Sequence, residues 1–173
     1  MTKPSARAVT PAAVLAGCMA KYTPEVGARA RDALRAMRER LPGAIELVYD
    51  NYNGLAIGFG PTDRTSDLVF SITLYPRWVS LFFVHGAGLP DPEKRLRGSG
   101  TRIRHVVLEN ERTLREPAVR ALVDHAVARA ATPFDATRRG RIVIKSVSSK
   151  QRPRRPATRR LTKFLAAART QTR

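Results

Sequence analysis

The sequence is poor in residues that form cross-links or bind transition metals. It has one cysteine, Cys18, and three histidines, His85, His105 and His125, whose spacings match no metal-binding motif. A single cysteine excludes an internal disulfide, which fits a reducing compartment and predicts a cytoplasmic protein. We therefore expect no metal centre, and we interpret the three histidines as ordinary structural or surface residues.

Long apolar runs are also missing. No stretch approaches the ~18 consecutive apolar residues that a membrane-spanning helix needs, so we expect no membrane span. The segment Leu15-Ala16-Gly17-Cys18 resembles the cleavage box of a bacterial lipoprotein, but the stretch before it contains Pro11 and too few apolar residues for a signal core. We expect Cys18 to lie on a helix instead.

Recognisable catalytic patterns are absent as well. Neither a Ser-His-Asp nor a Cys-His combination stands in a local context that would mark a nucleophile and its base. The sequence therefore predicts a protein that is not an enzyme and that carries no cofactor.

Acidic residues are missing from the last fifth of the chain. The net charge is +18, and residues 138–173 hold thirteen Lys or Arg and no Asp or Glu. We predict a domain over residues 1–135 and a basic arm over 136–173 that is largely extended or disordered. Within the arm, Ile142–Ile144 can add an edge strand, and 161–169 can form a short basic helix.

Because the arm contains no acidic partners, its charges are expected to be solvated or to meet a polyanion. Contact with RNA or DNA would release counterions and give strongly salt-dependent binding. A tail that only solvates the protein is the main alternative, and an acidic protein or an anionic membrane surface is a lesser one. The candidate nucleic-acid contacts are Arg138, Arg139, Arg141, Lys145, Lys150, Arg152, Arg154, Arg155, Arg159, Arg160 and Lys163.

Hydrophobic periodicity predicts an α+β fold. A period of 3.6 indicates helices over 11–21, 24–41 and 117–131, and Thr10 and Thr23 are suitable N-caps. A period of two indicates strands over 45–49, 55–59, 68–75, 79–84 and 103–108. The strand order predicts an antiparallel five-stranded sheet, flanked by N-terminal and C-terminal helices that pack on the same face.

Two further groups of residues are candidates for ligand binding. Gly98, Ser99 and Gly100, followed by Arg102, can present backbone N–H groups and a guanidinium to an anion, although a tight turn explains these glycines equally well. Aromatic and polar residues near strand ends can rim a small-molecule pocket close to His85, or stack nucleic-acid bases if they are exposed. This second group comprises Tyr49, Asn51, Tyr52, Arg77 and Trp78.

Several motifs resemble the YdhG-like family of bacterial proteins. They are Val48-Tyr49-Asp50-Asn51-Tyr52-Asn53, Leu74-Tyr75-Pro76-Arg77-Trp78-Val79-Ser80-Leu81-Phe82-Phe83, Leu89-Pro90-Asp91-Pro92 and Gly98-Ser99-Gly100-Thr101-Arg102-Ile103-Arg104-His105. The resemblance covers roughly residues 12–131 and implies a frataxin-like layer architecture.

One branch of that family is described as an intracellular iron chaperone, so the resemblance also implies iron binding as an alternative function. Frataxin-type iron handling relies on an acidic helix, because iron ions are hard cations that bind carboxylate oxygens. The helix over 24–41 instead carries five arginines against three acids, which disfavours the iron function.

Overall fold

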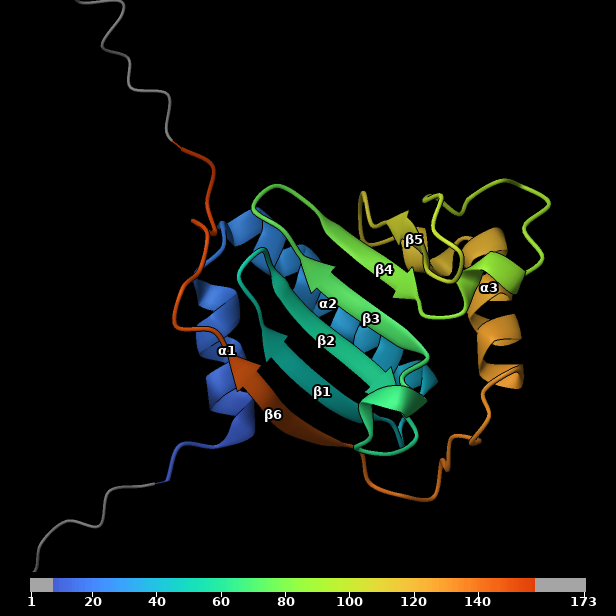
Figure 1. The fold of residues 1–173 in the computed structure, drawn as a ribbon, viewed down its shortest axis with the longest axis horizontal. Helices are drawn as coiled ribbons and strands as arrows, with labels where there is room; N and C mark the ends of the chain where they lie inside the picture. The colour runs from blue at the N-terminus through green and yellow to red at the C-terminus, as the bar shows by residue number, and fades with distance from the viewer. Residues whose placement is uncertain (1–7, 158–173) are drawn as a thin grey trace, which may run out of the picture.

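Three helices and a six-stranded mixed sheet form the part of the chain that the computed structural model describes, residues 8–157 (Figure 1). The helices are α1 Pro11–Ala20, α2 Pro24–Arg40 and α3 Pro117–Ala128. The strands are β1 Ile45–Asp50, β2 Leu55–Gly60, β3 Phe70–Leu74, β4 Val79–Phe83, β5 Arg104–Val107 and β6 Arg141–Val147. The basic helix predicted over 161–169 lies outside the described residues. No helix within 8–157 has the length and apolar character needed to cross a membrane.

The first two helices begin where the capping residues predicted. The Thr10 side chain accepts a hydrogen bond from Ala13 N at 3.2 Å, and Thr23 accepts one from Val26 N at 3.4 Å. In each case a proline occupies the first helical turn. Backbone N–H groups in this turn have no acceptor within the helix, so the N–H that proline lacks costs no helical hydrogen bond. Cys18 is buried on α1.

The sheet confirms the predicted α+β class but corrects its strand number and orientation. Strands β1 to β5 form an antiparallel meander in chain order, and β6 adds to the free edge of β1 in parallel (Figure 1). The direction follows from the return path, because Gly140 N donates to Pro42 O at 3.1 Å and so starts β6 beside the start of β1. The edge strand considered for Ile142–Ile144 is therefore confirmed.

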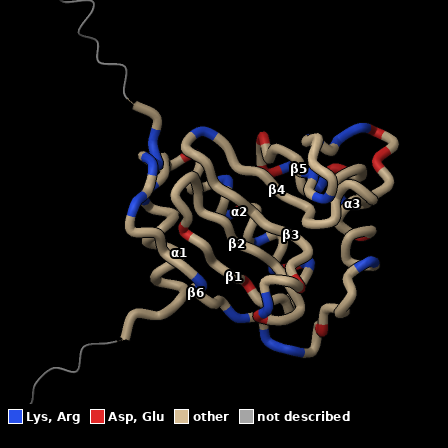
Figure 2. Tube along the Cα trace, in the orientation of Figure 1, with Lys and Arg blue, Asp and Glu red and all other residues tan. Residues whose placement is uncertain are grey.

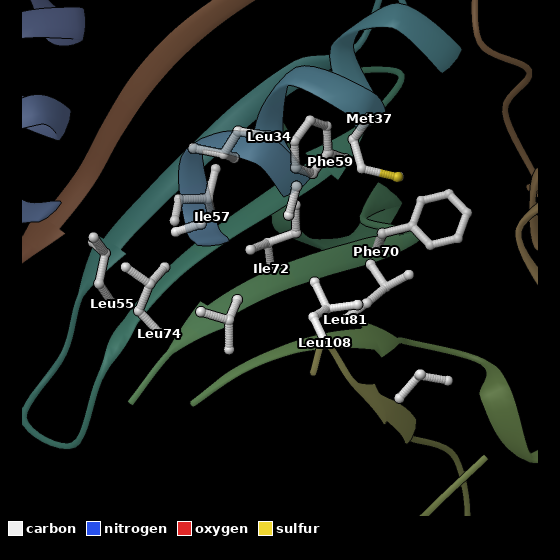
Figure 3. Packing of buried hydrophobic residues seen from close by; sticks show 14 of the residues in the cluster. Leu34, Met37, Leu55, Ile57, Phe59, Phe70, Ile72, Leu74, Leu81 and Leu108 are labelled. Carbon is white, nitrogen blue, oxygen red and sulfur yellow. The ribbon is translucent and has the colours of Figure 1, made fainter. Parts of the chain in front are cut away.

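The helices cover one face of this sheet. On α2, Leu34 and Met37 lie against Phe59 of β2 and Ile72 of β3 (Figure 3). Along β3 the core residues alternate with the half-buried Ser71 and Thr73, so the opposite face stays partly open. Phe83 is fully buried and its neighbour Phe82 is half-buried, as two successive residues of a strand require.

Tyr22 joins the helical layer to the ends of two central strands. It is only 2% exposed, and its hydroxyl accepts a hydrogen bond from Leu55 N at 2.9 Å and donates one to Leu74 O at 3.1 Å. Burial raises the pKa of Tyr22 to about 12, so the hydroxyl stays a donor at any physiological pH. The same corner of the domain receives the C-terminal arm.

A candidate nucleic-acid interface

The arm continues beyond β6 as a segment bound to the domain. Ser148 N donates to Asp50 O at 2.9 Å, and Arg152 N donates to Tyr52 O at 2.9 Å, so the segment follows the turn that joins β1 to β2. Figure 1 shows its red trace rising past α1 at this corner. Residues 148–156 are called the docked segment below.

A buried carboxylate anchors the docked segment. Asp50, at the end of β1, is fully buried, and its two oxygens contact Arg154 Nη2 and Lys21 Nζ, each at 2.7 Å. Burial alone would raise the pKa of Asp50, but hydrogen bonds from Lys21 and Gln151 outweigh it and hold the pKa below its ordinary value. Asp50 is therefore charged at neutral pH and needs these cations.

Arg154 supplies most of the remaining contacts of this anchor. It is 5% exposed, and its guanidinium also donates to the carbonyls of Asn51 and Tyr52 and lies 5.7 Å from the centre of the Tyr22 ring. A guanidinium that is buried and committed to internal acceptors is not offered to a ligand. Arg154 therefore holds the arm against the domain and is not exposed for contact with nucleic acid.

The neighbouring arginines of the docked segment are placed differently. Arg155 is exposed, and it donates to the carbonyls of Ala20, Lys21 and Tyr22 at 3.1–3.3 Å, where the C-terminus of α1 presents free acceptors. Arg152 is exposed and lies 5.9 Å from the centre of the Tyr52 ring. These contacts of both guanidinium groups are with neutral partners.

A cleft of about 820 Å³ separates the docked segment from the turn that joins β3 to β4. Trp78 lines it, is 43% exposed and stacks on Tyr75 with ring centres 5.0 Å apart and planes 28° apart. Three arginines contribute to the walls, and none of the described residues that line the cleft is acidic. The lining residues are Asn53, Tyr75, Pro76, Arg77, Trp78, Arg152, Pro153, Arg155 and Pro156.

The other basic residues of the arm are scattered. Arg138, Arg139 and Lys150 are exposed, while Arg141 forms an ion pair with Asp63 at 2.7 Å and Lys145 donates to Asp63 O at 3.4 Å. Figure 2 shows Lys and Arg both before β6 and along the docked segment after it. Arg159, Arg160 and Lys163 lie outside the described residues.

Among the described residues, Trp78 and His85 of the predicted pocket line different cavities. These residues flank the two ends of β4, and His85 lines a different cavity together with Arg129. Tyr49, on the open face of the sheet, bonds its hydroxyl to Thr65 Oγ1 at 2.7 Å. Asn51 and Tyr52 occupy the β1–β2 turn, where their carbonyls accept hydrogen bonds from Arg154 of the docked segment.

The glycine-rich loop lies near the opposite edge of the sheet, next to β5. Paired hydrogen bonds between Arg97 and His105 close this loop, and Gly98 has φ +107°, a conformation that favours glycine. Ser99, Gly100 and Arg102 are exposed, and the Arg104 guanidinium donates to the Gly100 carbonyl. The tight turn accounts for Gly98, and the loop contributes no residue to the lining of the cleft.

The carboxylates of α2 and β1 are the relevant groups for the implied iron function. Within residues 8–157, no three His, Cys, Asp or Glu side chains lie close enough together to hold a metal ion. On α2, Asp32 pairs with Arg35 at 2.7 Å, and Arg38 of the same helix pairs with Glu46 of β1 at 2.7 Å. Asp32 and Glu46 thus already have arginine partners.

Sequence reasoning missed the anchor formed by Lys21, Asp50 and Arg154, although one signal was present. Asp50 comes two residues after Val48 in β1, so the two side chains point to the same face of the sheet. Because Val48 faces the core, the Asp50 carboxylate is expected to be buried and to need a cationic partner. Which of the many basic residues would serve was not visible in the sequence.

Comparison with models of known protein families, with curated proteins and with solved structures finds no match to this chain.

Proposed function

We propose that this protein is a non-enzymatic module that binds nucleic acid in the cleft between its docked segment and the β3–β4 turn. The observation that supports the proposal most is the composition of the cleft, which is lined by three arginines and an exposed tryptophan and by no acidic residue among those described. Guanidinium groups pair with phosphates, and an indole ring stacks on bases.

The rest of the chain adds to this attraction. Pro156 lines the cleft, and the sequence after it has five further Lys or Arg and no acid over residues 158–173. The net charge of +18 also attracts a polyanion from a distance and accelerates its association. Nucleic acid supplies both the repeated phosphates and the planar bases that the two kinds of side chain recognise.

The test is a salt series with the full chain and a fluorescently labelled 12-nucleotide single strand of mixed sequence. Contact with about eight phosphates gives a log–log slope of about −6 for a single strand, since each contact contributes about 0.7. We expect binding at 50 mM salt that weakens along this slope. Absence of binding at 50 mM salt, or an affinity that does not change with salt, would remove the proposed function.

A further inference from the structure

The indole of Trp78 is held as a platform at the mouth of the cleft. The Tyr75 ring stacks on it with centres 5.0 Å apart, so the indole cannot turn freely, yet 43% of the residue is exposed. Arg77 precedes Trp78 in the same turn and gives the site a positive charge.

The opposite wall is arranged in advance as well. The Arg152 guanidinium lies over the Tyr52 ring at 5.9 Å and contacts Asn53 Oδ1 at 3.4 Å, and Arg155 is held by the carbonyls at the end of α1. Pro153 and Pro156 restrict the backbone between and beyond these arginines. Arg152 and Arg155 are therefore oriented before a ligand arrives, which lowers the side-chain entropy that they lose on binding.

We infer that the cleft selects single-stranded nucleic acid, with an unpaired base stacked on Trp78 and its flanking phosphates held by Arg77, Arg152 and Arg155. This inference rests on the proposed function and adds the class of nucleic acid. A single strand can turn a base out to stack on an aromatic ring, whereas the bases of a duplex are already stacked on one another.

The experiment compares three Trp78 variants on matched oligonucleotides. Labelled 12-nucleotide DNA and RNA, each as a single strand and as a duplex, are titrated by fluorescence anisotropy with the full chain. Trp78→Ala and Trp78→Leu are expected to weaken single-strand binding about tenfold, because stacking of one base is lost. Trp78→Phe keeps an aromatic face and is expected to stay within about threefold of the wild type. Duplex affinity is expected to change less than twofold in all three variants.

The outcomes separate the two proposals. Failure of the wild type to bind any oligonucleotide would remove the proposed function itself. Salt-dependent binding that is unaffected by Trp78→Ala and Trp78→Leu, or that weakens equally for single strands and duplexes, would leave the function and overturn the inference. Because Trp78 is exposed, the variants are expected to keep the wild-type circular dichroism; should Trp78→Ala unfold, the comparison of Trp78→Leu with Trp78→Phe decides the matter.

Discussion

Replacing Arg154 by alanine is expected to lower the free energy of unfolding by about 3 kcal/mol, because it leaves the fully buried Asp50 carboxylate with Lys21 as its remaining cation. The variant also loses the hydrogen bonds that Arg154 donates to the carbonyls of Asn51 and Tyr52. In a chain of this size the loss corresponds to a melting temperature lower by about 10 °C. Urea unfolding at pH 7, followed by circular dichroism, measures it.

Arg141→Ala is the matched control, since it breaks another ion pair between the arm and the domain. Its side chain and that of Asp63 are each 54% exposed, and exposed pairs of this kind contribute at most about 1 kcal/mol. A double variant, Asp50→Asn with Arg154→Met, removes both buried charges together and is expected to recover most of the lost stability. Equal losses in Arg154→Ala and Arg141→Ala would contradict the anchoring role.

The difference between wild type and Arg154→Ala is expected to depend on pH in one direction. The pKa of Asp50 is lowered in the folded state, so its contribution is complete above the unfolded-state pKa of about 3.9. The contribution is lost as the pH falls through the lower folded-state value. The difference in stability between the two proteins should therefore narrow under acid conditions, when Asp50 is protonated in both, to the part that comes from the hydrogen bonds to the carbonyls of Asn51 and Tyr52.

The largest expected change in binding comes from the three cleft arginines. Replacing Arg77, Arg152 and Arg155 together by glutamine removes three phosphate contacts, so the log–log salt slope for a single strand is expected to become shallower by about 2. By the same relation, affinity at 0.1 M salt is expected to fall about a hundredfold. Anisotropy titrations at several salt concentrations measure both quantities.

A second triple variant controls for the loss of net charge. Arg64, Arg112 and Arg120 are exposed and do not line the cleft, and their replacement by glutamine removes the same three positive charges. We expect the control variant to keep the wild-type salt slope within about 0.5, since only direct phosphate contacts release counterions. Equal slopes in the two triple variants would show that binding depends on total charge and not on the cleft.

The α+β class was predictable because most of its signals are local. Capping threonines, prolines in the first turn and the change of period after the second helix depend on residues a few positions apart. The meander of β1 to β5 was predictable for the same reason, since successive strands joined by short turns pair antiparallel.

The position of β6 required information that local patterns do not hold. Its pairing with β1 joins residues about a hundred positions apart, and its direction depends on where the chain returns, which the bond between Gly140 and Pro42 determines. Ile142 and Ile144 indicated a strand in the sequence, but their spacing carries no information on the partner or on its orientation.

The candidate site was predictable in its parts and not in its assembly. The arm and the Arg77–Trp78 turn were singled out separately, and the structure brings Arg152 and Arg155 to that turn. Composition treats the arginines of the arm as equivalent, whereas the buried Asp50 binds Arg154 and leaves its neighbours exposed. The buried Asp50 carboxylate thus binds Arg154, while Arg152 and Arg155 line the cleft.

The emission of Trp78 tests the central claim most directly, because it is the single tryptophan of the chain and it lies in the cleft. Titrating the full chain at low salt with an unlabelled 12-nucleotide single strand is expected to quench this emission, saturating at the concentration where anisotropy shows binding, because a base stacks on the indole. Binding seen by anisotropy while the emission of Trp78 stays unchanged would contradict the account.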